Sequence, residues 1–159
     1  MFLNKRYTQA SVAFLRAGRT LEAAICRAYF LREKARSIST ATSVARIKAL
    51  VTAADAFFAC AQNSPPKRVN ERLAYYGIAG ECYSEARDLK SAGDSYRMAE
   101  RYNEAARTYL KGECFDEMVG VITQHEDAID DNLLERLKMV ARMYYFKVYV
   151  NGLLVSEYF

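Results

Sequence analysis

The sequence has little of what interrupts helices and little of what performs catalysis. It contains 2 prolines and 7 glycines in 159 residues, no tryptophan, and one histidine, His125. Because proline lacks the backbone donor and glycine is conformationally free, their scarcity favours helical segments. A lone histidine offers no partner for acid–base or metal chemistry. We interpret His125 as a cap or surface residue near a helix end.

Motifs that bind phosphate or metal are also missing. The sequence holds no G-x-x-x-x-G-K-[ST] loop and no G-x-G-x-x-G turn. The acidic run Glu126–Asp131 lacks the alternating ligands and glycine of an EF-hand loop, and favours a helix N-terminus instead. Cys26, Cys60, Cys82 and Cys114 are too far apart for a zinc knuckle or a thioredoxin motif. We therefore expect no enzyme activity, no cofactor and no metal.

Long hydrophobic runs are absent as well. No apolar stretch reaches the roughly 18 residues of a membrane span. The first three residues are followed by charged side chains rather than by the hydrophobic segment of a secretory signal. Unpaired cysteines are typical of reducing compartments. We expect an intracellular protein, cytoplasmic or nuclear, that does not associate with membranes.

What the sequence does have is a period of thirteen residues. Tyr83, Tyr96 and Tyr109 are spaced at this interval. Three, six and nine residues after each tyrosine come a small residue, a large apolar residue and a further apolar residue. Those three sets are Ala86, Ala99 and Gly112; Leu89, Tyr102 and Phe115; and Ala92, Ala105 and Met118. Self-similarity at a fixed period is the mark of a repeat architecture.

Thirteen residues accommodate about two and a half helical turns and a short connection. Two units make one antiparallel hairpin, and each helix needs its neighbours to cover its apolar stripe. The predicted fold is therefore all-α, an α-solenoid of tetratricopeptide-like antiparallel hairpins with about eight helices. The expected helices are 3–17, 21–37, 44–62, 67–87, 92–100, 103–111, 115–125 and 130–147.

The predicted domain organisation is a single helical-repeat domain over residues 1–147. Adjacent prolines make 63–66 the best place for an internal break. Residues 148–159 are β-branched and apolar around Asn151-Gly152, which in isolation reads as a hairpin turn. Because a lone hairpin after eight helices is marginal, we predict a poorly packed C-terminal tail.

Charge is distributed unevenly along the chain. Residues 1–72 hold 13 Lys/Arg and 4 Asp/Glu, a net charge of +9, and residues 73–159 hold 10 Lys/Arg and 15 Asp/Glu, a net charge of −5. A basic half can attract nucleic acid or an acidic partner. The alternative is that these cations lie on solvated helix faces or pair with the acidic half. The candidate contact residues are Arg27, Arg32, Lys34 and Arg36.

Two stretches resemble tetratricopeptide-like helical repeats. Both match all or part of the sequence pattern aromatic–x–x–Ala–Gly–x–x–x–Glu–Ala–Ala. They are Phe14-Leu15-Arg16-Ala17-Gly18-Arg19-Thr20-Leu21-Glu22-Ala23-Ala24 and Ala99-Glu100-Arg101-Tyr102-Asn103-Glu104-Ala105-Ala106.

Over roughly residues 10–147 the chain also resembles the helical region of fungal large TPR-and-ankyrin-repeat proteins that carry a UvrD-type superfamily 1 helicase core. The similar segments are Cys26-Arg27-Ala28-Tyr29-Phe30-Leu31-Arg32-Glu33-Lys34-Ala35-Arg36, Ala56-Phe57-Phe58-Ala59-Cys60-Ala61 and Met143-Tyr144-Tyr145-Phe146-Lys147. The resemblance implies a fragment of such a protein, a helicase-associated scaffold whose ATPase residues lie outside this chain.

These observations leave two hypotheses for function. The first is a non-catalytic scaffold that binds a protein partner or a helicase domain in cis, with nucleic acid as a further partner of the basic half. The second is a tetratricopeptide-like adaptor in vesicle or intracellular transport with no link to nucleic acid.

Overall fold

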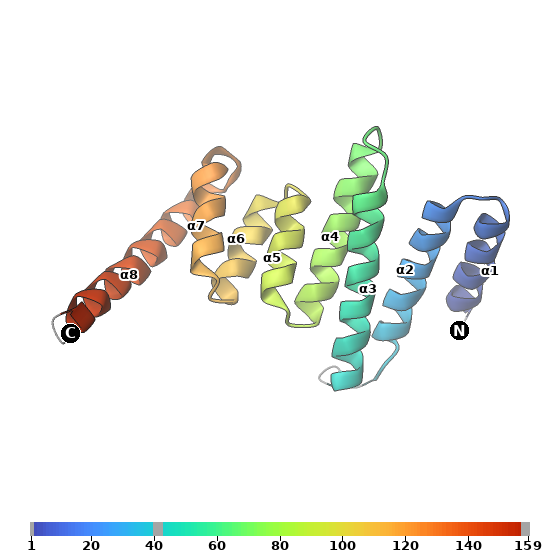
Figure 1. Cartoon of the computed structure of the whole chain (residues 1–159), viewed down its shortest axis with the longest axis horizontal. Coiled ribbons are helices and arrows are strands. Elements are labelled where there is room, and N and C mark those ends of the chain that lie inside the picture. Colours follow the sequence, from blue (N-terminus) through green and yellow to red (C-terminus); the bar gives the residue numbers. More distant parts are fainter. Residues whose placement is uncertain (1, 40–42, 157–159) are drawn as a thin grey trace.

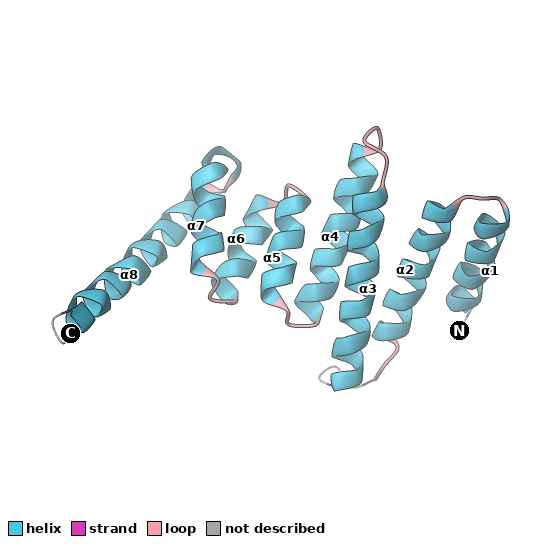
Figure 2. Ribbon diagram, in the orientation of Figure 1, coloured by secondary structure: helices cyan, strands magenta, loops and turns pink. Residues whose placement is uncertain are grey.

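The computed structural model describes residues 2–39 and 43–156, with side chains described for 6–39 and 43–148. Within those ranges it contains helices and no strand (Figure 1, Figure 2). The all-α prediction is therefore confirmed. The elements are α1 Phe2–Arg16, α2 Thr20–Arg36, α3 Val44–Asn63, α4 Val69–Glu85, α5 Leu89–Met98, α6 Tyr102–Lys111, α7 Phe115–Gln124, the 3₁₀ turn η1 Glu126–Ala128, and α8 Asp131–Ser156.

The helices follow one another along the long axis of the molecule in chain order. Figure 1 shows α1 and α8 at opposite ends of this row. Each helix packs mainly against the helices before and after it in sequence, and α6 also touches α8. Most contacts between helices are therefore between neighbours in the sequence.

The thirteen-residue period is visible in the backbone. Helices α5, α6 and α7 have ten residues each, and three-residue turns separate them. Arg87, Glu100 and Glu113 lie thirteen apart and adopt left-handed φ values of 64°, 58° and 56°. The next amide in each turn donates back to the carbonyl of Tyr83, Tyr96 or Tyr109, at 2.9–3.0 Å. This is the Schellman pattern of a helix C-terminus, repeated in register.

Helix α1 ends in the same way as α4, α5 and α6. Gly18 has a φ of 72°, and the amide of Arg19 donates to the carbonyl of Phe14 at 2.9 Å. Gly18 suits this position, because glycine adopts the left-handed conformation without a Cβ clash. The later turns place ordinary side chains in that strained region.

The period marks both ends of these helices, since Leu89, Tyr102 and Phe115 begin α5, α6 and α7. Tyr96 lies in the last turn of α5, and Ala99, three residues later, is the cap that follows the helix. The predicted start of this helix at residue 92 is wrong, since α5 begins at Leu89. The reason is Asp88, whose side chain accepts a hydrogen bond from the Ser91 amide at 3.2 Å and so begins the helix earlier.

Each periodic tyrosine is buried, and two of the rings rest on a glycine of the preceding helix. A Cβ added to Gly80 would lie 2.8 Å from the Tyr96 ring, and one added to Gly93 would lie 2.4 Å from the Tyr109 ring. Tyr109 is 1% exposed. Small residue and large ring therefore interlock, which allows these short helices to approach closely.

The proline pair ends α3 and connects it to α4 by a tight loop. One hydrophobic cluster nevertheless includes residues on both sides of this connection, among them Phe57 of α3 and Tyr83 of α4. At the other end of α3, Ser43 caps the helix, since its side chain accepts a hydrogen bond from the Arg46 amide at 3.2 Å.

The C-terminal segment differs from the structure predicted for it. Helix α8 runs from Asp131 to Ser156, so it does not end at 147, and Asn151-Gly152 is helical rather than a hairpin turn. A growing helix gains one hydrogen bond per residue, whereas β-propensity depends on neighbouring strands that are absent from the described residues. The side chains of 149–159 lie outside the described residues, so the predicted poor packing of 148–159 stays a prediction.

Candidate interaction groove

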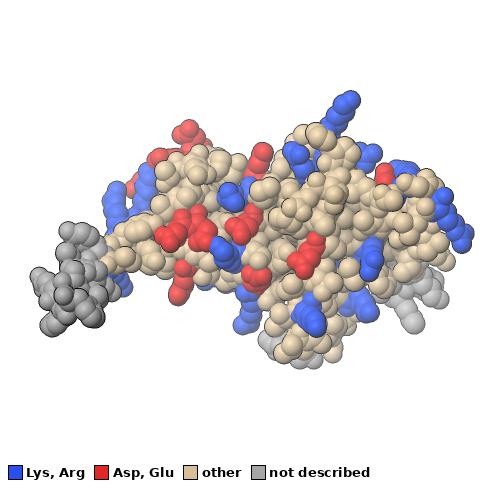
Figure 3. All heavy atoms as spheres, viewed as in Figure 1, with Lys and Arg blue, Asp and Glu red and all other residues tan. Residues whose placement is uncertain are grey.

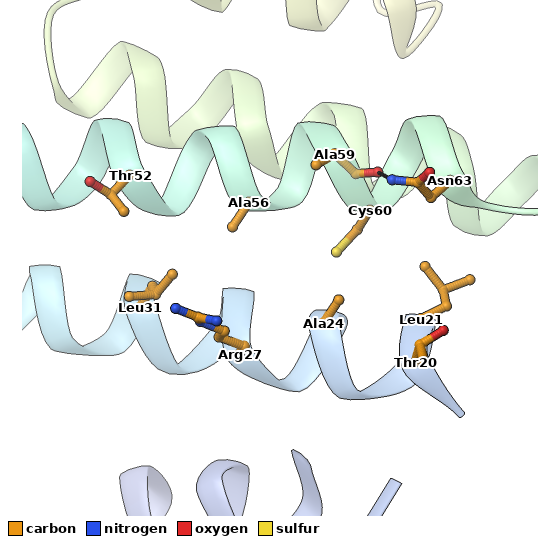
Figure 4. A pocket seen from close by; sticks show the side chains of 10 residues that line it. All are labelled: Thr20, Leu21, Ala24, Arg27, Leu31, Thr52, Ala56, Ala59, Cys60 and Asn63. Carbon is orange, nitrogen blue, oxygen red and sulfur yellow. Dashed lines mark hydrogen bonds between the residues drawn. The ribbon is translucent and has the colours of Figure 1, made fainter. Parts of the chain in front are cut away.

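A groove of about 630 Å³ runs between α2 and α3 (Figure 4). Thr20 and Asn63 lie at one end, and Leu31 and Thr52 lie toward the other. At 1.5 Å per residue, the stretch from Thr20 to Leu31 corresponds to roughly 17 Å. The remaining lining residues are Leu21, Ala24, Arg27, Ala56, Ala59 and Cys60.

Alanines open this groove. Ala24 of α2 points into the gap from one side, and Ala56 and Cys60 of α3 point into it from the other (Figure 4). Larger side chains at these positions would fill the space, because packed helix seams leave few voids. Phe57, the residue after Ala56, points to another face of α3, where it is fully buried and packs edge-on against Tyr29 of α2. The interface between α2 and α3 is therefore closely packed on its buried side, and an apolar groove remains on its exposed side.

Arg27 is the one charged residue among those that line the groove. Its side chain rises from α2 between Ala24 and Leu31 (Figure 4), and the residue is exposed. Within the described part of the chain it has no ion pair, whereas nearby Glu22 is paired with Arg19 at 2.8 Å and with Arg68 at 3.7 Å. A guanidinium beside apolar walls can bind a carboxylate bidentately.

Two polar side chains at the edges of the groove, Thr52 and Asn63, are already hydrogen-bonded within α3. The Thr52 hydroxyl donates to the Lys48 carbonyl at 2.9 Å, and the Asn63 side-chain amide donates to the Ala59 carbonyl at 2.8 Å. These bonds leave Arg27 as the main polar determinant. The arrangement suits an apolar segment that carries one acidic side chain.

The four cations predicted as contact residues do not form one surface. At 100° per residue, Arg27 and Lys34 share one face of α2, and Arg32 and Arg36 share the opposite one. Arg32 and Arg36 both make contacts with other side chains of the protein. The Arg32 guanidinium lies over the rings of Tyr29 and Phe57, at 5.0 and 5.7 Å from their centroids, and Arg36 forms an ion pair with Glu85.

Arg32 has one further feature. Its Nε is buried without a hydrogen bond and lies 3.5 Å from a Glu33 carboxylate oxygen. The ring contacts and this ion pair hold the guanidinium between α2 and α3. Arg32 therefore stabilises the helix pair instead of presenting charge to a partner, and Arg27 is the predicted residue that the structure places in a groove.

Acidic and basic side chains are also distributed unevenly in space. On the face shown in Figure 3, most Asp and Glu side chains lie over the C-terminal half, and Lys and Arg are spread along the whole molecule. Three cations in that acidic half were missed by counting charges along the chain. They are Arg107, Lys111 and Arg136, which line a second pocket between α6 and α8.

The histidine and cysteine side chains take part in capping and packing. His125 caps α7 and stacks on the Tyr102 ring with centroids 3.8 Å apart. All four cysteines are free, and burial raises their pKa values, that of Cys82 to about 11. The described residues hold no group of three or more His, Cys, Asp or Glu side chains that could bind a metal ion.

The chain matches no family model, no curated protein and no solved structure. The resemblances drawn from sequence motifs therefore stay predictions, and the groove has to be interpreted from its own residues. Among the helices described, none is long and apolar enough to cross a membrane.

Buried tyrosine and cysteine side chains, which are weak acids, make the free energy of unfolding depend on pH. Burial raises the pKa of Tyr83 and Tyr109, and the hydrogen bonds that they donate to Asp55 and Asp94 raise it further. Because the pKa of Cys82 is 9.0 before burial and about 11 in the fold, the unfolded state loses its proton first. We expect the free energy of unfolding to fall as pH rises above about 9.

Urea unfolding followed by circular dichroism at about pH 8 and about pH 10 measures this loss. A lower urea midpoint at the higher pH is the expected result. A midpoint that is unchanged or higher would contradict the assignment of these groups to the core.

Proposed function

We propose that this chain is a non-catalytic helical scaffold that binds a segment of a partner protein in the groove between α2 and α3. The observation that carries the proposal is an apolar groove about 630 Å³ in volume whose lining contains one cation, Arg27, without an ion pair in the described residues. Grooves between helices commonly receive an amphipathic helix through apolar anchors. The expected occupant is such a helix with an acidic residue positioned for Arg27.

A protein partner is favoured over nucleic acid for this half of the molecule. A nucleic-acid strand is held by a track of cations that neutralise successive phosphates. Arg32 and Arg36 are engaged in internal contacts, so they do not extend such a track from Arg27. From the resemblance to helicase-associated repeats, we further propose that the partner segment belongs to a helicase domain of the same larger protein.

The test is a selection of displayed random peptides on the folded protein, followed by binding measurements on variants. We expect the selected peptides to combine apolar residues with at least one Asp or Glu. Arg27→Glu should weaken their binding about tenfold or more, because it replaces attraction by repulsion. Ala56→Arg should abolish binding, because the long side chain occupies the groove.

Matched controls separate the groove from general charge effects. Lys34→Glu makes the same charge change on the same helix but outside the groove, and Ala45→Arg makes the same size change at an exposed position of α3. Both controls should bind the selected peptides as the unmodified protein does. Peptides that bind all four variants equally, or a selection that enriches nothing, would refute the groove as the binding site.

A further inference from the structure

A second pocket, about 670 Å³ in volume, lies between α6 and α8. Arg107 and Lys111 are one turn apart on α6, and Arg136 comes from α8. All three side chains belong to exposed residues. The floor contains Leu110 and Leu133, and Asn132 and Asp130 complete the lining. Two helices that are not consecutive in sequence thus bring three cations to one place.

These three cations have no ion pair in the described part of the chain, although carboxylates are numerous in this half. The C-terminal half has more acidic than basic residues, and three of its other cations are paired with them. Lys90 is paired with Glu117, Arg101 with Glu104 at 2.9 Å, and Lys138 with Glu126. Acceptors are therefore plentiful nearby, yet the pocket keeps its positive charge.

The single carboxylate of the pocket does not neutralise it. The Asp130 side chain accepts a hydrogen bond from the Leu133 amide at 3.1 Å and caps the start of α8. The Asp130 amide in turn donates to the Asn103 side-chain oxygen at 3.0 Å. The helix dipole accounts for Lys111 in the last turn of α6 but not for Arg136, which lies within α8. Three cations and one carboxylate leave a net charge of +2.

We propose that this pocket binds the phosphate group of a phosphorylated serine or threonine on a partner protein. A phosphate monoester carries a charge between about −1.5 and −2 near neutral pH, which matches the pocket. Two guanidinium groups offer paired donors to its oxygens, and clusters of arginine are a recurring means of recognising phosphorylated segments. The leucine floor can receive the apolar part of the residue that carries the phosphate.

A nucleic-acid strand fits less well. The half of the chain that carries the pocket has a net charge of −5, so a long polyanion would meet overall repulsion there. This inference rests on the proposed function, since it assumes a protein partner. It concerns a different surface, and it is tested with small probes, so either proposal can fail without the other.

The experiment titrates the protein with N-acetyl-phosphoserine amide and follows the backbone amide signals of Leu110 and Leu133 by NMR. Saturable shifts at these residues are the expected result, and N-acetyl-serine amide should produce none. Arg107→Gln and Arg136→Gln should each weaken binding about tenfold. Arg142→Gln, an exposed arginine of α8 outside the pocket, should leave binding unchanged.

Two further probes identify the source of the phosphate. Inorganic phosphate should bind more weakly than the phosphoserine probe, because it makes no contact with the leucine floor. Tighter binding of inorganic phosphate, or tighter binding of oligothymidylate through the same arginines, would overturn the assignment to a phosphorylated protein. Equal shifts with the unphosphorylated probe, or equal weakening by Arg142→Gln, would overturn the pocket itself. Circular dichroism of each variant confirms that it is folded.

Discussion

Tyr109→Ala should lower the free energy of unfolding by about 3 to 5 kcal/mol, the range for removing a large buried ring. The side chain is 1% exposed, packs on Gly93 of the preceding helix and donates a hydrogen bond of 2.6 Å to Asp94. Its loss leaves a cavity and an unpartnered carboxylate between two ten-residue helices. Urea unfolding followed by circular dichroism measures the change.

The matched control for this prediction is Phe146→Ala. Phe146 is an aromatic residue of α8 that is 69% exposed. Its truncation should change the free energy of unfolding by no more than about 0.5 kcal/mol. Similar losses for the two variants would contradict the role of the periodic tyrosines as the core between short helices.

Gly93→Ala should destabilise the protein, although alanine is the better helix former. The added Cβ would lie 2.4 Å from a ring carbon of Tyr109, closer than two carbons approach. Overpacking of this kind costs about 1 to 3 kcal/mol, and it outweighs the gain in helix propensity of about 1 kcal/mol or less. The measurement is the shift of the urea midpoint at a constant slope.

A double-mutant cycle makes this prediction sharper. In the Tyr109→Ala background the ring is gone, so Gly93→Ala should become stabilising by about 0.5 to 1 kcal/mol. Gly120→Ala is the independent control, because no atom lies within 4 Å of the position of its Cβ. It should be stabilising in both backgrounds. A Gly93→Ala effect that keeps its sign without the ring would contradict the interlocked packing.

The sequence predicted the helical class, because spacing along a helix determines which residues share a face. It did not predict which glycine each ring covers. Tyr96 meets Gly80 and Tyr109 meets Gly93, sixteen residues earlier in each case, and that offset depends on how two helices slide past each other. It also placed the start of α5 too late, because the Asp88 cap was not weighed against the apolar pattern.

The candidate sites were harder to predict than the fold. Arg27, Arg32, Lys34 and Arg36 were grouped because they are close in sequence, yet a helix turns by 100° per residue and separates them into two faces. A helical projection would have revealed that split. It would not have revealed the groove beside Arg27, which requires alanines of α2 and α3 to face each other. The α6–α8 pocket depends on the return of a helix that is distant in sequence.

The proposal of a scaffold depends on peptide binding in the groove between α2 and α3. The most direct measurement therefore maps which helices a bound peptide protects. Hydrogen exchange would be compared, with and without a peptide selected on the unmodified protein, across all described helices. The account predicts slower exchange confined to α2 and α3, around Arg27 and Ala56, and none in the Arg27→Glu variant. Protection centred on other helices, or protection that survives Arg27→Glu, would contradict it.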